Sequence, residues 1–285
     1  MDHRGSFGKQ FGVSDAPPSR DQAAQMRGAK QLIYRGVRDV RSQLAGGQVG
    51  VLVDEQFGAQ VLRDARDDGL VVAMPVEKSG QERFALQYGD QTSAHVAEFA
   101  PEYVKVLVRM NPQDNADESA AQLGELAALS AVLAANRQGF LYELLVPATP
   151  AQLQRAGSKG VYDRDIRPGL VVEVIAANQR AGVEPTLWKI EGLETTDAAV
   201  DVVAAAKAGG RSADCLVLGR DAPKEVLDHW FRVAAPVPGF VGFAVGRSIW
   251  EDPLTTYRRD GDNDRFVETV RENYLHYAAS YLAAR

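Results

Sequence analysis

Short apolar runs alternate with longer amphipathic segments from Gln48 to the end of the chain. Most runs are about five to eight residues long and rich in Val, Leu and Ile, which is typical of strands buried on both faces of a parallel sheet. The runs are Val49–Val53, Leu70–Met74, Tyr103–Met110, Phe140–Val146, Pro185–Ile190, Cys215–Leu218 and Phe240–Val245. The amphipathic segments predict helices that include Glu118–Asn136, Thr196–Lys207 and Arg265–Ala284.

Strict alternation of strands and helices predicts a parallel sheet covered by helices, either an open doubly wound sheet or a closed barrel. The chain contains neither GxGxxG nor GxxxxGK[ST], one of which would be expected in a nucleotide-binding open sheet. A length of 285 residues without a linker or internal repeat suits one barrel. We therefore predict a single (β/α)8 TIM-barrel domain over residues 1–285. Only seven strands are predicted, so we expect the first strand to be truncated, with its end near the polar segment Met1–Gly5.

Charge and composition narrow the range of partners. The formal net charge is -6 and the pI is about 5.4, which argues against a nucleic-acid or anionic-membrane surface. A few local cations still suffice to bind one phosphorylated small molecule. Cys215 is the one cysteine and no Cys or His cluster has metal-ligand spacing, so we expect no disulfide and no metal. Without a signal peptide or an apolar membrane span, the expected location is the cytoplasm.

Charged residues inside or just after the apolar runs are the candidates for chemistry, because barrel active sites lie at the C-terminal ends of the strands. Lys189 and Glu191 lie on one face of their strand, and Trp188 and Ile190 lie on the other. Burial disfavours the charged form of a lysine, and Lys105 offers a second cation that would add to this effect. A neutral amine is what attack on a carbonyl requires. On spacing alone, the alternative is a structural ion pair between Lys189 and Glu191.

Glu143 lies within an apolar run, where an ionised carboxylate is rarely buried without a partner. It is either a structural partner for a cation or a general acid and base. Two Gly-Arg pairs follow the last two runs, and glycine with arginine can bind phosphate, although each arginine can instead pair with an acid such as Asp221 or Glu251. The predicted phosphate-binding residues are Gly219, Arg220, Gly246 and Arg247. The predicted substrate-binding residues are Asp2, Arg4, Asp54, Glu77, Arg109 and Glu191.

Eight segments in this order resemble the class I aldolases related to tagatose-1,6-bisphosphate aldolase. The resemblance covers nearly the whole chain and is nearest to the aldolase domain linked to cleavage of 2-deoxy-5-keto-gluconate 6-phosphate in inositol catabolism. The segments are Asp2–Phe7, Val53–Gly58, Pro75–Gly80, Val104–Pro112, Tyr142–Pro147, Trp188–Gly192, Val217–Arg220 and Gly242–Arg247. Each segment is weak alone, and their combination is specific.

The resemblance implies a Schiff-base mechanism without metal or cofactor. By it, Lys189 forms the imine, Glu143 moves protons at the substrate carbonyl, and Lys105 is a second active-site lysine. Arg247 matches an arginine that binds phosphate, and Gly219 matches a position whose backbone touches phosphate. Asp221 departs from the family, which has glycine there, and its charge predicts altered recognition of the substrate's charged end.

We therefore expect a reversible aldolase that cleaves a phosphorylated keto sugar or keto acid. The alternatives are an aldolase for tagatose 1,6-bisphosphate or another sugar phosphate or sulfo-sugar, and a transaldolase-like or decarboxylating Schiff-base enzyme. A non-catalytic, ligand-sensing barrel is the alternative of a different class. The tyrosine-rich helix Arg265–Ala284 offers a surface for a homo-oligomer.

Overall fold

The computed structural model describes residues 1, 4–13, 17–44 and 47–285. Its contacts divide the chain into two compact units. Unit 1 comprises Met1–Gln81, Leu86–Val104 and Val245–Ala279, and unit 2 comprises Glu82–Ala85, Lys105–Ala244 and Ser280–Arg285. Each unit is considered by itself below.

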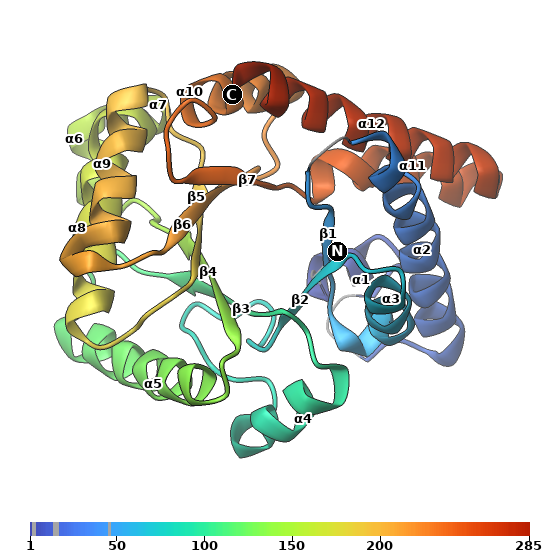
Figure 1. The fold of residues 1–285 in the computed structure, drawn as a ribbon, viewed down its shortest axis with the longest axis horizontal. Helices are drawn as coiled ribbons and strands as arrows, with labels where there is room; N and C mark the ends of the chain where they lie inside the picture. Colours follow the sequence, from blue (N-terminus) through green and yellow to red (C-terminus); the bar gives the residue numbers. More distant parts are fainter. Residues whose placement is uncertain (2–3, 14–16, 45–46) are drawn as a thin grey trace. The chain divides into compact units, whose positions relative to one another are not determined.

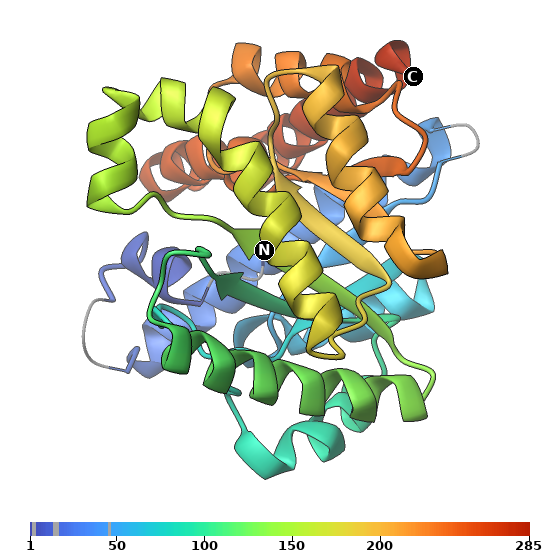
Figure 2. The same ribbon diagram turned by 90° about the vertical axis from the view of Figure 1, so that its left-hand side faces the viewer.

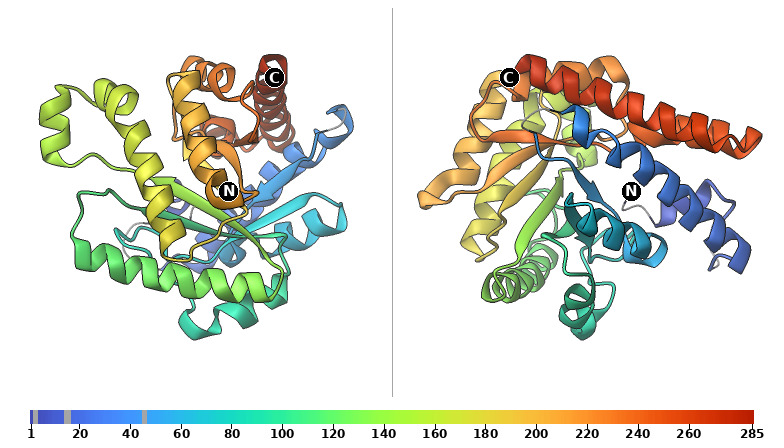
Figure 3. Two further views of the ribbon diagram at one scale, coloured as in Figure 1. Left: turned by 60° about the vertical axis from the view of Figure 1, so that its left-hand side comes forward. Right: turned by 45° about the vertical axis from the view of Figure 1, so that its right-hand side comes forward.

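Unit 1 is built on a pair of parallel strands covered by helices. The strands β1 (Gly50–Leu52) and β2 (Val71–Pro75) are in parallel register, with Val51 opposite Val72. The helical segments are α1 (Gly5–Lys9), α2 (Arg20–Arg38), η1 (Arg41–Gln43), α3 (Glu55–Asp67), η2 (Gly89–Gln91), α4 (Thr92–Phe99), α11 (Arg247–Asp260) and most of α12 (Asn263–Ala284). Helices α2 and α3 lie side by side (Figure 3, right).

Unit 2 contains the longer strands and the helices that follow them. Its strands are β3 (Tyr103–Arg109, from Lys105 onward), β4 (Gly139–Leu145), β5 (Leu187–Glu191), β6 (Asp214–Leu218) and β7 (Phe240–Ala244), in that order across the sheet. Its helical segments are α5 (Ala116–Ala135), α6 (Pro150–Ala156), α7 (Lys159–Val161), the π-helix η3 (Tyr162–Ile166), α8 (Arg167–Arg180), α9 (Thr196–Lys207), η4 (Ala208–Gly210) and α10 (Lys224–Ala234). Helices α8 and α9 cover the outer side of β4, β5 and β6 (Figures 1 and 2).

All seven predicted strands are present, and their ends differ from the predicted ones by at most two residues. The predicted helices correspond to α5, α9 and α12. The parallel α/β class is therefore confirmed. No eighth strand occurs in the part of the chain that the structure describes, so a closed eight-stranded barrel is not established.

Helix α2 was not predicted, because the first thirty residues are mostly polar. The helix begins at a capping box, in which the Ser19 side chain accepts from the Gln22 backbone N–H and the Gln22 side chain accepts from the Ser19 N–H. Its apolar face buries Met26, Ile33 and Val37. The capping box and this spacing are the signals in the sequence that predict the helix.

Gly192, directly after β5, allows α10 to pack closely. A Cβ atom at this position would lie 1.8 Å from Cδ2 of Trp230, whose Nε1 donates a 2.8 Å hydrogen bond to Glu194. The indole is therefore held in place against the glycine.

We expect Gly192→Ala to lower the free energy of unfolding by about 3 kcal/mol, because the new methyl group overpacks against the indole. Gly124→Ala is the matched control, since Gly124 lies inside α5 with nothing within 4 Å of the added Cβ. The control should gain about 0.5–1 kcal/mol from helix propensity. Urea unfolding measures both, and equal effects would contradict the packing argument.

Candidate functional site

Three charged side chains from β3, β4 and β5 meet on one face of the sheet in unit 2. Glu143 of β4 lies directly opposite Lys189 of β5 in the parallel register. Oε2 of Glu143 is 3.0 Å from Nζ of Lys105 and 3.1 Å from Nζ of Lys189. The side chains of Lys105, Glu143 and Lys189 are only 1%, 6% and 7% exposed. One buried carboxylate is therefore shared by two lysines.

The opposite face of β4 and β5 is aromatic and fully buried. The rings of Tyr142 and Trp188 lie 4.7 Å apart, and Trp188 is 0% exposed. Burial raises the pKa of Tyr142 above its ordinary value, and an interaction with Asn178 of α8 opposes this. The prediction that Trp188 faces the helices while Lys189 faces the other side of the sheet is confirmed.

The same register continues onto β6 and β7 with apolar and small residues. Leu216 lies opposite Lys189, and Gly242 lies opposite Leu216. Leu216 is partly exposed, in contrast to the buried Cys215 and Val217 on either side of it. Lys105 of β3 therefore lies on one side of Glu143 and Lys189, and the apolar, partly exposed Leu216 of β6 lies on the other side.

A second charged network closes the C-terminal ends of β4, β5 and β6. Glu191, the last residue of β5, accepts a 2.9 Å hydrogen bond at Oε2 from the Val146 N–H, and its Oε1 is 2.9 Å from Nη1 of Arg220. Arg167, at the start of α8, donates to the backbone oxygens of Glu191 and Gly192 at 3.4 and 2.6 Å. These contacts hold the end of the strand that carries Lys189.

Asp163 completes this network from the π-helix η3. Its Oδ1 accepts from Nε of Arg167 at 3.1 Å and from Nη1 of Arg220 at 3.2 Å, and its Oδ2 accepts from Lys159 at 2.6 Å. Burial opposes ionisation, but the Lys159 hydrogen bond and the two guanidinium charges hold the pKa of Asp163 below its ordinary value. Arg220 thus pairs with Asp163 and Glu191.

In unit 1 the predicted residue Arg4 lies in a separate buried cluster. Its guanidinium donates to both carboxylate oxygens of Glu55, at 3.2 and 2.9 Å, and to the backbone oxygens of Pro75 and Glu77. The Tyr88 hydroxyl also donates to Glu55, at 2.7 Å. Burial opposes ionisation of Glu55, but the Arg4 charge and the Tyr88 hydroxyl hold the pKa of Glu55 below its ordinary value. Burial raises the pKa of Tyr88 to about 12, and its hydrogen bond to Glu55 adds to the rise.

Asp54 is the N-cap of α3 and also the partner of a buried lysine. Its Oδ1 accepts from the Phe57 N–H at 2.8 Å, and its Oδ2 pairs with Nζ of Lys30. The side chains of both Asp54 and Lys30 are fully buried. Asp54 therefore has a structural role, because it caps α3 and pairs with a buried lysine.

The structure places the other predicted residues in different parts of the chain. Arg109 is the last residue of β3, and Gly219 directly follows β6, both in unit 2. Gly246 is the N-cap residue of α11 and Arg247 is its first residue, both in unit 1. Asp2 lies outside the described residues. The roles of all the predicted site residues remain predictions.

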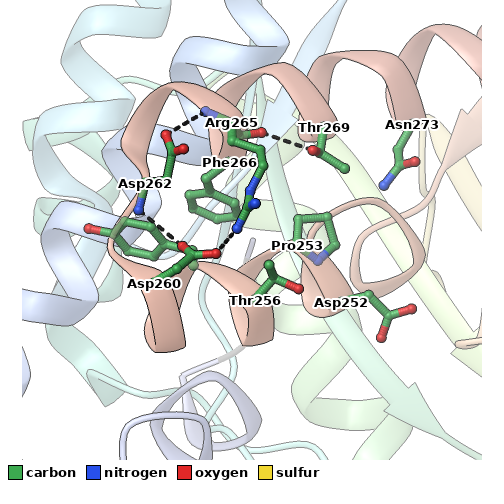
Figure 4. A pocket seen from close by; sticks show the side chains of 10 residues that line it. Asp252, Pro253, Thr256, Asp260, Asp262, Arg265, Phe266, Thr269 and Asn273 are labelled. Carbon is green, nitrogen blue, oxygen red and sulfur yellow. Dashed lines mark hydrogen bonds and ion pairs between the residues drawn. The ribbon is translucent and has the colours of Figure 1, made fainter.

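A cavity of about 460 Å³ lies elsewhere in unit 1, between α11 and α12 (Figure 4). Four of its carboxylate and aromatic groups have evident structural roles. Asp260 pairs with Arg265, Asp262 accepts from the Arg265 backbone N–H, and the rings of Tyr257 and Phe266 stack at 4.9 Å. None of the predicted site residues lines this cavity.

Sequence reasoning missed several residues of both networks. Lys30 lies on the apolar face of α2, four residues after Met26 and three before Ile33, and a charge on such a face is itself a signal of a buried ion pair. Asp163 and Arg167 are four residues apart, a spacing that brings side chains together on a helix. No local pattern indicates that Arg220 joins them, because that contact depends on the packing of η3 against the end of β6.

Among the described residues, no group of three or more His, Cys, Asp or Glu side chains is placed to hold a metal ion. No helix there has both the length and the apolar composition needed to cross a membrane.

The sequence matches a family model described as "Uncharacterized protein conserved in bacteria (DUF2090)" over residues 1–285. No curated protein matches it significantly. The fold is similar to that of a fructose-bisphosphate aldolase from Plasmodium falciparum, with a TM-score of 0.62 and 14% identity over 100% of this chain and 96% of the other. It is also similar to Cgl0159 from Corynebacterium glutamicum (TM-score 0.55, 18% identity, 96% and 83% coverage) and to the YdjI aldolase from Escherichia coli K12 (0.54, 10%, 88% and 87%). At these identities the likeness shows a shared fold.

We expect Glu143→Gln to destabilise the protein more than Lys105→Met does. The first change leaves two buried lysines without their carboxylate, at a cost of about 3–5 kcal/mol. The second leaves Lys189 and Glu143 as a balanced pair. Lys207→Met, which breaks a pair with Asp214 that is over a third exposed, is the control and should cost less than about 1 kcal/mol. Urea unfolding measures the three variants, and a Lys105→Met cost equal to that of Glu143→Gln would argue against the shared carboxylate.

The Arg4–Glu55 pair should make stability depend on pH in the acid range. Because the folded pKa of Glu55 is below 4.5, the stability that this group contributes is present above pH 4.5 and is lost as the pH falls through the folded pKa. We expect Glu55→Gln to be about 3 kcal/mol less stable than wild type at pH 7, with the gap narrowing below pH 4.5. Urea midpoints from pH 3 to pH 7 test this, and a gap that does not change with pH would refute it.

Proposed function

The chain belongs to the family DUF2090, and we propose that its activity is reversible carbon–carbon bond cleavage through an imine on Lys189. Lys189 is the nucleophile, Glu143 transfers protons, and Lys105 is the second cation of the site. The observation that carries the proposal is the single carboxylate shared by two buried lysines.

Two lysine amines and one carboxylate lie together in a site that is almost closed to water. Nucleophilic attack requires a lone pair on a lysine nitrogen, and Glu143 is placed to take up the proton that frees it. Lys189 is the more accessible of the two lysines, at 7% exposed against 1% for Lys105, so we assign the attack to Lys189.

The proposed steps follow from this arrangement. The Lys189 amine adds to the substrate carbonyl, and Glu143 passes protons so that the carbonyl oxygen leaves as water. The bond between the α and β carbons then breaks, and the protonated imine accepts its electron pair. The hydroxyl on the departing β carbon loses its proton, and that carbon becomes an aldehyde. Protonation of the enamine carbon and addition of water release the ketone and restore Lys189. Because the protonated imine is the electron sink, these steps require no metal, and activity should survive a chelator.

The neighbouring strands provide suitable surroundings for a bound ketone. Lys105 and Glu143 can contact a substrate oxygen on one side of Lys189, and the partly exposed Leu216 and the glycine at position 242 leave an apolar surface on the other. The fold shared with two aldolases agrees with this chemistry. A non-catalytic, ligand-sensing protein would not need two lysines on one buried carboxylate.

Several finer expectations belong to this proposal. We propose that the sheet belongs to an eight-stranded barrel and that the substrate is a phosphorylated keto sugar or keto acid, with 2-deoxy-5-keto-gluconate 6-phosphate as the first candidate. Tagatose 1,6-bisphosphate and sulfo-sugars are the alternatives. Phosphate binding by Gly246 and Arg247, a cytoplasmic location and a homo-oligomer are part of the same proposal.

Borohydride reduction in the presence of a ketone substrate should fix a covalent adduct on Lys189. Intact mass detects the adduct and peptide mapping locates it, with dihydroxyacetone phosphate, pyruvate and malonate semialdehyde as probes. Lys189→Met should lose the adduct and cleavage activity, because the remaining lysine of the cluster, Lys105, is only 1% exposed. Glu143→Gln should retain some adduct but cleave at least about a hundredfold more slowly, since proton transfer contributes about that much.

Lys207→Met is the matched control, because its lysine pairs with one carboxylate on a partly exposed surface of the same unit. It should behave as wild type in both assays. Normal cleavage by Lys189→Met, or an adduct mapped only to surface lysines, would refute the mechanism.

A further inference from the structure

Arg220 occupies a turn that few side chains adopt. The turn runs from Gly219 to Ala222, closed by a 3.0 Å hydrogen bond from the Ala222 N–H to the Gly219 oxygen. Both central residues have positive φ, 50° for Arg220 and 60° for Asp221. Glycine or asparagine is usual in such positions, so this backbone is costly for arginine. The turn places the Arg220 side chain at the C-terminal end of β6, beside the end of the Lys189 strand.

The guanidinium of Arg220 is held through one nitrogen. Nη1 makes both of its contacts, at 3.2 Å to Oδ1 of Asp163 and 2.9 Å to Oε1 of Glu191. Asp163 and Glu191 are in turn fixed by Arg167 and by the Val146 N–H. This bracing orients the guanidinium plane and reduces the entropy lost when a ligand binds.

Among the residues that the structure describes, none accepts a hydrogen bond from the other edge of the same guanidinium, which carries Nε and Nη2 of Arg220. The side chain is 29% exposed, whereas Glu191 and Arg167 are 3% and 1% exposed. Nε and Nη2 together form the fork that binds a planar anion through two parallel hydrogen bonds.

The charges around Arg220 favour a singly charged ligand. Lys159 also pairs with Asp163 but is 61% exposed and screened by solvent, so among the less exposed charges Arg167 and Arg220 balance Asp163 and Glu191; an added dianion such as phosphate would leave two excess negative charges there and a carboxylate only one. A protonated imine on Lys189 would supply one positive charge nearby. One carboxylate therefore matches the site better than one phosphate.

We propose that Arg220 binds a carboxylate of the substrate, and that the protein acts on a keto acid whose carboxylate lies within a few bonds of the reacting carbonyl. This inference rests on the proposed function for the position of the carbonyl. Glu191 is two residues beyond Lys189, about 6.6 Å along the strand, and its carboxylate touches Arg220. A short keto acid spans that gap, and a phosphate on Arg247 would be a separate contact.

The test compares keto acids with their neutral methyl esters. Pyruvate, acetoacetate and levulinate place the carboxylate one, two and three bonds from the carbonyl. At least one of them should be trapped on Lys189 by borohydride about tenfold or more better than its ester, as expected for a charge-assisted bidentate pair. Arg220→Gln should lower acid trapping far more than ester trapping and so remove that preference, and Arg220→Lys should restore part of it.

Arg211→Gln is the matched control, because Arg211 of unit 2 makes a bidentate pair with Glu184 at 2.7 and 2.8 Å. It should keep the wild-type preference for acids. The inference is overturned if Arg220→Gln lowers acid and ester trapping equally, if the preference survives in that variant, or if Arg220 instead governs trapping of dihydroxyacetone phosphate.

A second measurement separates this inference from the proposed function. In Lys189→Met no imine can form, yet the keto acids should still raise the melting temperature, and the further change Arg220→Gln should abolish that rise. If wild type forms no adduct with any ketone but this stabilisation is seen, the aldolase proposal fails and the carboxylate site stands. Absence of the stabilisation overturns the carboxylate site even if Lys189 is trapped.

Discussion

The contact on which the rest of the site depends is the carboxylate of Glu143 placed between two buried lysines. Neither Lys105 nor Lys189 could remain in the interior of the sheet without a counter-ion, because an unpaired buried charge costs several kcal/mol. The parallel register that sets Glu143 opposite Lys189 therefore makes burial of these groups possible, and it also brings together the residues to which the proposed imine chemistry is assigned.

The network at the strand ends complements this cluster. Arg167 pairs with Asp163 and Glu191 and ties the end of β5 to η3, while Arg220 contacts the same two carboxylates through one nitrogen only. A π-helix and a turn with two positive φ angles are both unfavourable locally, and they occur together where these charges meet. The side chain of Arg220 is also more accessible than that of the clustered Arg4 in unit 1, at 29% exposed against 7%.

Most of the strand pattern could be predicted from the sequence, because buried parallel strands are continuous apolar runs. The two-residue period of a strand predicted that Lys189 and Trp188 lie on opposite faces of β5, whereas Glu143 was predicted only as a charge within an apolar run. Contacts made by helices were harder to predict: Lys30 and Arg167 are far in sequence from Asp54 and Glu191, and only packing brings them together. The pairing of Arg220 with Asp163 depends on a turn conformation that an Arg-Asp sequence does not indicate. Pairing of Arg220 with an acid was left open as an alternative to phosphate binding, but Asp163 and Glu191 were not foreseen as its partners.

Hydrogen–deuterium exchange at the carbon next to a ketone carbonyl tests the central claim most directly, because exchange requires both the imine and proton transfer. Proton NMR of pyruvate and hydroxyacetone in deuterated buffer follows it without knowledge of the natural substrate. Wild type should exchange at least one of these ketones well above the buffer rate, and Lys189→Met should not. Glu143→Gln should exchange slowly, although borohydride still traps its Lys189. Exchange by Lys189→Met at the wild-type rate, or no exchange by wild type above buffer, would contradict the account.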